Sequence, residues 1–243
     1  MRTVATAGAS PRRRERLFFT GMAVAITLTV FAGFSRTYFL KSYFGAPPLI
    51  PLLHLHGLVF TSWIVLFLVQ NLLVATNRTR IHRRLGILGA VIAALMVIVG
   101  VATALIRTRQ SFVQSGDTAA LSFLTIPLGD LLLFSILVGA GLYFRRRADV
   151  HKRLLLLATI SILAAAVARL PLEILKAGPP AFFGLTDIFI VGLLVYDLVT
   201  LRRIHRVTAW GGLAIIASQP LRLMIGSTHA WIAFANWLTQ WVG

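Results

Sequence analysis

The stretch Pro51–Gly86, PLLHLHGLVFTSWIVLFLVQNLLVATNRTRIHRRLG, decides the fold of this chain. Within it, a long apolar run separates two histidines, His54 and His56, from a basic loop that contains His82. A helix that crosses a membrane needs roughly 20 mostly apolar residues. The stretch therefore predicts a helix that spans the bilayer and then turns back at a basic loop.

The composition of the whole chain is also typical of a membrane protein. Of its 243 residues, 58% are hydrophobic and only 13% are charged, whereas soluble domains average about 25% charged residues. A surface this apolar requires a cover of lipid. Cysteine is absent, so we expect no disulfide, thiolate metal site, iron–sulfur cluster or covalently attached c-type haem.

Seven stretches are long and apolar enough to span, and they predict an all-α, polytopic membrane bundle. We interpret residues 1–16 as a disordered basic tail, residues 17–226 as the seven-helix domain, and residues 227–243 as a short segment at the outer interface. The predicted spans are Leu17–Phe39, Leu52–Thr76, Leu85–Leu105, Ile126–Tyr143, Leu154–Leu170, Phe183–Leu201 and Val207–Ile225.

The basic residues predict the orientation of the bundle. With these spans, most of the 24 Lys and Arg residues fall on the same side as the N-terminus. Cytoplasmic loops carry such an excess, so we expect a cytoplasmic N-terminus. The net charge of +17 then indicates contact with anionic lipid headgroups rather than nucleic acid. We call the end of the bundle near the N-terminus the inner end, and the opposite end the outer end.

An internal repeat follows the first helix. Each of three inner loops has a histidine before a basic residue, where the returning helix begins, and these histidines are His82, His151 and His205. The pattern predicts one leading helix and three similar hairpins. Near the outer end, the entering helices carry His56, Asp130 and Asp187, so the first hairpin has His where the others have Asp.

Polar side chains gather at the outer end of this predicted bundle. Ionisable groups inside a membrane are costly and normally face the bundle interior, either paired or in a watery cavity. We therefore expect one polar chamber open to the outside, and the alternative is a set of Asp–Arg pairs that only lock helix ends. The residues are Arg36, His54, His56, Asp130, Arg169, Glu173, Asp187, Gln219 and Arg222.

A transition metal is one candidate cofactor for this chamber. His54 and His56 with the carboxylates of Asp130 and Asp187 would make a nitrogen and oxygen site for iron, copper, zinc or manganese. Residues i and i+2 lie about 200° apart on an ideal helix. His56 shares a face with Trp63, so we favour it as the inward-facing histidine of the pair.

A b-type haem is the second candidate cofactor. It requires two inward histidines at similar depth, such as His54 or His56 with His229, or two of the three loop histidines at the inner end. A di-haem helix would carry a second histidine about 14 residues after His56. That position is Gln70, which argues against a di-haem arrangement.

Five motifs of the chain are distinctive. They are Phe31–Phe34 (FAGF), Leu53–Phe60 (LHLHGLVF), His82–Gly86 (HRRLG), His151–Ile160 (HKRLLLLATI) and Ser218–Arg222 (SQPLR). These motifs resemble those of a family of uncharacterised bacterial integral membrane proteins. The likeness extends from about Arg14 to Trp237, and it implies a bacterial inner-membrane location without implying an activity. A looser similarity to b-type cytochrome-like membrane proteins comes from the His-Arg style of the loops.

These observations leave three functions open. One is a redox or metal-handling protein that uses His54, His56, Asp130 and Asp187 as ligands. Another is a transporter or sensor that takes a small polar or anionic ligand from the periplasm, with Arg36, Arg169 and Arg222 as anion-binding groups and His56 as a proton-linked group. The third is a structural membrane subunit. The pattern does not decide whether the protein is an enzyme, and no soluble-enzyme motif is present.

Overall fold

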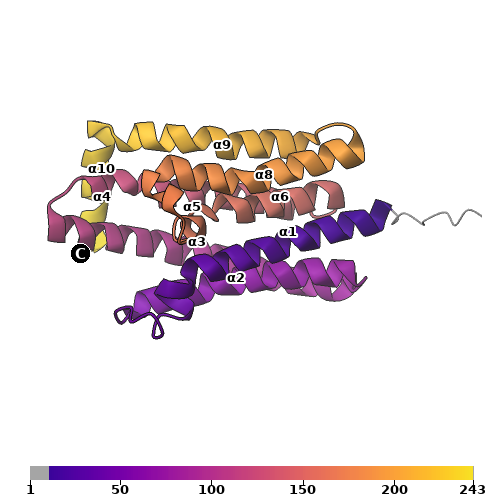
Figure 1. Cartoon of the computed structure of the whole chain (residues 1–243), viewed down its shortest axis with the longest axis horizontal. Coiled ribbons are helices and arrows are strands. Elements are labelled where there is room, and N and C mark those ends of the chain that lie inside the picture. The colour runs from indigo at the N-terminus through magenta and orange to yellow at the C-terminus, as the bar shows by residue number, and fades with distance from the viewer. Residues whose placement is uncertain (1–10, 243) are drawn as a thin grey trace, which may run out of the picture.

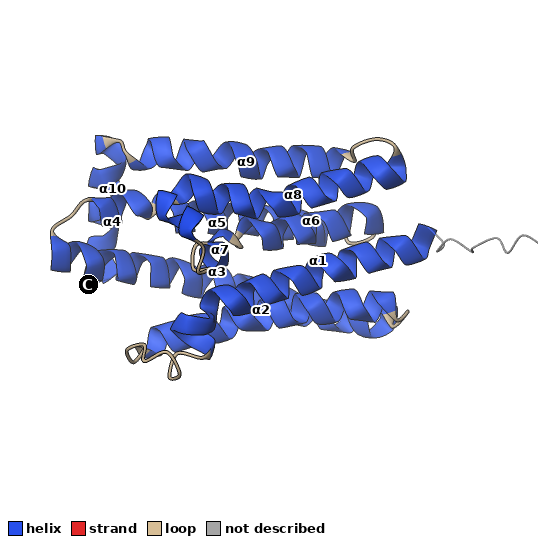
Figure 2. Ribbon diagram, viewed as in Figure 1, coloured by secondary structure: helices blue, strands red, loops and turns tan. Residues whose placement is uncertain are grey.

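The computed structural model describes residues 11–242, which fold into helices joined by turns and loops, as Figure 2 shows. The predicted all-α class is confirmed for this part of the chain. The elements are α1 (Pro11–Phe34), η1 (Ser35–Phe39), α2 (Pro51–Ala75), α3 (Thr79–Ser115), α4 (Ala119–Phe123), α5 (Thr125–Tyr143), α6 (Ala148–Ser161), α7 (Ala164–Val167), η2 (Glu173–Ala177), α8 (Pro179–Leu201), α9 (Arg206–Gly226), α10 (His229–Thr239) and η3 (Gln240–Val242).

Within residues 11–242, six segments are long and apolar enough to cross a membrane, so the chain is a multi-pass membrane protein. The seventh predicted span forms α9, whose 21 residues measure about 32 Å at 1.5 Å per residue. That α9 also crosses the bilayer stays a prediction, as does the cytoplasmic N-terminus. The six segments are Arg12–Phe39, Pro51–Ala75, Thr79–Ser115, Ala119–Tyr143, Ala148–Val167 and Pro179–Leu201.

Two helices are longer than the sequence suggested. Residues 11–16, which we predicted to belong to a disordered tail, form the first turns of α1, and residues 1–10 lie outside the described range. The predicted span Leu85–Leu105 is the middle of α3, which runs for 37 residues, or about 55 Å. Hydropathy finds only the lipid-covered part of a helix, so polar turns that extend it escape notice.

Local chemistry explains where several helices begin and end. Pro51 opens α2 and Pro179 opens α8, positions where the missing N–H of proline costs no helical hydrogen bond. Gly116 ends α3 in the left-handed region with φ +67°, a conformation that glycine adopts without strain. These residues set the points at which the helices begin and end.

Two spans are interrupted near the outer end. The segment Ser35–Phe39 continues α1 as a π-helix, and the predicted span Leu154–Leu170 is divided into α6 and α7. At the second break, the N–H of Leu163 donates to the carbonyl of Ile160 at 3.0 Å. Such an i→i−3 bond tightens the backbone into a 3₁₀-like turn.

The long helices lie side by side along the longest axis of the molecule, as Figure 1 shows. The yellow α9 lies on one side of the bundle, and the indigo and purple α1 and α2 lie on the other. The second hairpin packs between them, and Leu156, Leu157 and Ile160 of α6 are completely buried. The core of the bundle is therefore centred on α6.

The C-terminal segment folds against the protein. In α10, Ala235 packs with Leu105, Leu121 and Leu124 in a small cluster at the far end of α3. The indole N–H of Trp231 donates to the carbonyl of Leu121 at 2.9 Å. Figure 1 shows α10 lying across this end of the bundle. Its predicted place among the lipid headgroups stays a prediction.

Candidate functional site

A cavity of about 570 Å³ lies towards the outer end, between the first helices and the second hairpin. Both interrupted segments contribute to its wall, η1 through Tyr38 and the α6–α7 break through Ile162 and Leu163. Most of its lining is aliphatic or aromatic, including Phe60 of α2 and Phe182 of α8. The wall also contains a few polar side chains, an arrangement typical of ligand-binding cavities.

Three of the residues predicted for a polar chamber line this cavity. They come from three different elements: His56 from α2, Asp130 from α5, and Arg169 from the turn after α7. His56 stacks on Phe60 with ring centroids 4.1 Å apart. The predicted inward orientation of His56 agrees with this placement.

Asp130 is buried and forms an ion pair with Arg222 of α9. The same guanidinium donates from Nη1 to the carbonyl of Ile126 at 3.1 Å. Gly129 makes room for it, because a Cβ there would lie 2.1 Å from Cδ of Arg222. The charge of Arg222 is therefore neutralised by Asp130. This pair matches the predicted alternative, an Asp–Arg contact that locks two helices together.

Arg169 differs from Arg222 in having no acidic partner within residues 11–242. Its Nη1 donates to the carbonyl of Ala165 at 2.5 Å, and its guanidinium carbon lies 4.8 Å from the centroid of the Phe34 ring. The side chain of Arg169 is exposed, whereas that of Arg222 is buried. Among residues 11–242, no carboxylate lies within ion-pair distance of Arg169.

Two buried polar atoms of the cavity wall have no hydrogen-bond partner in the described range. They are Oγ1 of Thr103, a residue only 7% exposed, and Nδ1 of His56. A threonine in a helix usually donates to a carbonyl one turn earlier, as Thr159 does to the carbonyl of Leu155 at 2.9 Å. Unpaired buried groups are rare in proteins, so these atoms indicate a site that a ligand or a water molecule completes.

The remaining predicted chamber residues lie away from this wall. His54 is exposed, and its carbonyl accepts a hydrogen bond from the Tyr38 hydroxyl at 3.3 Å. Arg36 is exposed, with its guanidinium carbon 5.5 Å from the centroid of the Phe44 ring. Two further pairs complete the set, Glu173 with Lys176 and Asp187 with Gln219.

The predicted metal ligands do not form a ligand set. Asp130 is paired with Arg222, and the Gln219 side chain donates to Asp187 at 2.7 Å. Among residues 11–242, no group of three or more His, Asp or Glu side chains could hold a metal ion. The four residues His54, His56, Asp130 and Asp187 therefore do not fit a single metal centre.

Two of the loop histidines meet at the inner end. The rings of His82 and His151 have centroids 6.3 Å apart and lie nearly perpendicular. Nδ1 of His151 is 2.7 Å from the carbonyl of Gly141, while Nδ1 of His82 is buried without a partner. The ring of His205 has a different role, because it caps α9 by accepting from the N–H of Val207. A haem between His82 and His151 stays a prediction.

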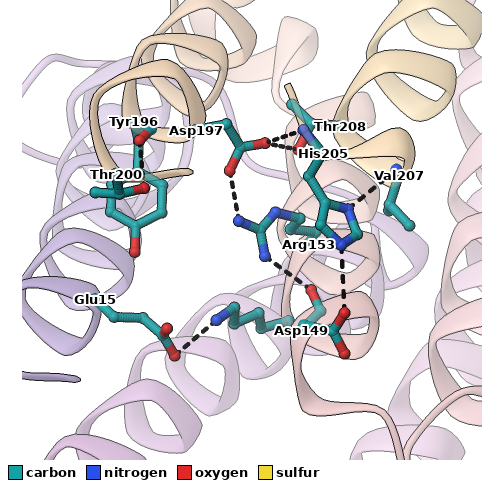
Figure 3. Close-up of polar contacts among 10 residues, drawn as sticks. Glu15, Asp149, Arg153, Tyr196, Asp197, Thr200, His205, Val207 and Thr208 are labelled. Atoms are coloured by element: carbon teal, nitrogen blue, oxygen red, sulfur yellow. Dashed lines mark hydrogen bonds and ion pairs between the residues drawn. The ribbon is translucent and has the colours of Figure 1, made fainter. Parts of the chain in front are cut away.

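A second buried ion pair lies at the inner end, and sequence reasoning did not identify its basic partner. Asp197 lies close in sequence to Arg202 and Arg203, but its partner is Arg153 of α6, at 2.5 Å. Figure 3 shows Asp197 also accepting from the hydroxyl of Thr208 at 2.6 Å. The available signal was the position of Arg153 at the inner end of the neighbouring hairpin.

The chain was compared with known protein families, with curated proteins and with solved structures. None of the three comparisons gives a match. The function of this protein is therefore inferred from the cavity and the residues that line it.

Proposed function

We propose that this membrane protein binds a small, largely apolar molecule in the cavity near its outer end and acts as a transporter or sensor of that molecule. The observation that carries the proposal is the cavity itself, about 570 Å³ with His56, Asp130, Thr103 and Arg169 in an otherwise mostly apolar wall. This volume lies within the range of roughly 300–1,000 Å³ that is usual for small-molecule sites.

The chemistry of the wall supports an amphipathic ligand. Aromatic and aliphatic side chains would surround the apolar body, since burying apolar surface is the main favourable term in binding such a molecule. The unpartnered atoms of His56 and Thr103, together with Arg169, would take its polar end. A fully polar solute would leave most of the wall without a matching contact.

The interrupted helices support a site that changes shape. Irregular backbone at membrane depth is tolerated where it is buried in protein or lines a cavity, and many transporters bind substrate at broken helices. The cavity wall includes the π-helical η1 and the break between α6 and α7. Both could change conformation at lower cost than a continuous helix.

The redox function suggested by the sequence has less support. Its four candidate metal ligands do not form a ligand group, and two of them are already paired with Arg222 and Gln219. A reduced-minus-oxidised spectrum and elemental analysis of the purified protein would test a haem or metal directly. A Soret band, or about one metal ion per chain, would make a cofactor protein the better description.

The location in a bacterial inner membrane belongs to the same proposal. It is supported by the basic loops gathered at one end of the bundle and by the resemblance of the HLHG and HRRLG motifs. Lipid is the partner that the six apolar segments require.

Binding in the cavity can be tested by filling it. We would purify the protein in mild detergent, extract it with organic solvent and identify any molecule that copurifies by mass spectrometry. The variant Ala165→Phe places a large side chain at an accessible position of the wall. The matched control is Ala209→Phe, at an exposed position of α9 outside the wall.

The proposal predicts that a molecule copurifies with the wild type and with Ala209→Phe, and is lost from Ala165→Phe. Equal recovery from all three proteins would place the molecule in the lipid around the bundle and contradict the proposal.

A further inference from the structure

Arg222 and Arg169 make similar contacts, although Arg222 is buried and Arg169 is exposed. Arg222 lies in α9 two residues after Pro220, and Arg169 lies in the turn after α7, two residues before Pro171. Arg222 donates to the carbonyl of Ser218, four residues earlier, and its guanidinium carbon lies 5.1 Å from an aromatic ring centroid, that of Phe183.

Arg169 repeats these contacts with different residues. It donates to the carbonyl of Ala165, also four residues earlier, and its guanidinium carbon lies 4.8 Å from the ring centroid of Phe34. The difference between the two sites is the acid, because Arg222 is paired with Asp130 and Arg169 has no carboxylate partner in residues 11–242.

The internal repeat explains which residue takes the place of the missing acid. Arg222, from the third hairpin, meets Asp130 on the entering helix of the second hairpin. By the same step, the counterpart of Arg169 of the second hairpin belongs on the entering helix of the first, whose residue at the corresponding position is His56. Both residues line the cavity. A histidine cannot neutralise an arginine, and within residues 11–242 no carboxylate pairs with Arg169.

The other charged groups of the wall do not supply one. Arg107, also in the wall, donates to the side chain of Gln110 at 2.9 Å. Asp130 is the acidic residue of the wall, and it is already paired with Arg222. The wall therefore carries an excess of positive charge.

We infer that the ligand carries one anionic group, which pairs with Arg169 as the carboxylate of Asp130 pairs with Arg222. The inference rests on the proposed function and names its ligand class, an acid with a single anionic head on an apolar body. The unpartnered Oγ1 of Thr103 and Nδ1 of His56 are additional polar contacts in the same wall. Such a ligand could be a free carboxylic acid or an acidic membrane lipid.

The test measures binding of radiolabelled dodecanoate to the full chain in phosphatidylcholine nanodiscs, with dodecanol as an uncharged competitor of equal length. Arg169→Gln removes the charge, and Arg36→Gln is its control at an exposed arginine outside the wall. His56→Asp supplies an internal carboxylate, and His54→Asp adds the same charge two residues away at an exposed position.

We expect dodecanoate to bind the wild type about tenfold to a hundredfold more tightly than dodecanol, the range typical of one charge-assisted hydrogen bond. Arg169→Gln and His56→Asp should each lose this preference, and both control variants should keep it. A second set of nanodiscs with phosphatidylglycerol identifies the source. Competition by this lipid assigns the site to an acidic lipid, and its absence assigns it to a free acid.

The outcomes separate this inference from the proposed function. If the acid and the alcohol bind with equal affinity, or if His56→Asp leaves dodecanoate binding unchanged, the inference is wrong and the cavity remains a site for neutral molecules. If neither compound binds the wild type, both proposals fail. Thermal unfolding of each variant in the same nanodiscs confirms that a loss of binding does not come from a loss of fold.

Discussion

Arg153 and Asp197 join the second and third hairpins through a 2.5 Å ion pair whose side chains are 3% and 0% exposed. Asp197 accepts two further hydrogen bonds, from the backbone N–H of His205 at 3.1 Å and from the hydroxyl of Thr208 at 2.6 Å. The partners of this carboxylate lie at the starts of α6 and α9, so it fixes how these two helices begin relative to the inner end of α8 (Figure 3).

Replacing this carboxylate should destabilise the whole bundle. We expect Asp197→Asn to lower the free energy of unfolding by about 3–5 kcal/mol, since it leaves the buried Arg153 without its counter-ion. The control is Glu173→Gln, which breaks the exposed pair with Lys176 and should have little effect. Thermal unfolding in detergent, followed by circular dichroism, measures both. Similar melting temperatures for the two variants would contradict this account.

The ion pair of Asp130 and Arg222 should behave as a coupled unit. Asp130→Leu or Arg222→Met alone leaves one buried charge unpaired and should cost about 3–5 kcal/mol of stability. The double variant removes both charges, so we expect it to be more stable than either single variant. A double-mutant cycle of unfolding free energies gives the coupling energy, and additive losses would show that the two side chains act independently.

Close packing between α1 and α7 should not tolerate a methyl group. A Cβ at Gly33 would lie 2.1 Å from the carbonyl oxygen of Ala166, so we expect Gly33→Ala to push the helices apart and lower the melting temperature. Gly21→Ala is the matched control in the same helix, where a Cβ meets nothing within 4 Å. Because alanine favours helix over glycine by about 1 kcal/mol, the control should be neutral or slightly stabilised.

The indole of Trp63 should depend on Thr159 for its hydrogen bond. Its Nε1 donates to Oγ1 of Thr159 at 3.3 Å, and its ring meets that of Phe134 edge-on with centroids 5.0 Å apart. We expect Thr159→Val to cost about 1–3 kcal/mol, because a buried donor is left unpaired. The melting temperature reports the change, and an unchanged melting temperature would mean that the indole finds another acceptor.

The long apolar helices were predicted from hydropathy, because lipid selects apolar residues over a fixed thickness, and six of the predicted spans overlap segments long and apolar enough to cross a membrane. Sequence reasoning also grouped His56, Asp130 and Arg169, which all line the cavity. It did not find the partners, because the Asp130–Arg222 and Arg153–Asp197 pairs join different hairpins. From the sequence alone, a neighbouring residue such as Arg202 is as good a candidate partner for Asp197 as Arg153 is.

The interruptions of α1 and α6 also left no clear mark in the sequence. Ser35–Phe39 and the turn at Ile162 contain no proline, and both read as continuations of an apolar helix. Their conformation depends on neighbours that the linear order does not reveal, such as the carbonyl of Ala166 against Gly33. From the sequence, therefore, only a group of polar residues at a similar depth could be predicted, and the shape of the cavity could not.

The length of α3 also determines how the molecule sits in a bilayer. The helix is about 55 Å long, whereas the hydrocarbon core is about 30 Å thick. Near-vertical insertion therefore leaves several turns of α3 outside the hydrocarbon. At its far end these turns are buttressed by α10 and carry Arg107 and Arg109. The protein thus has a rigid helical projection at one membrane surface, which limits how far the bundle can shift towards the other leaflet.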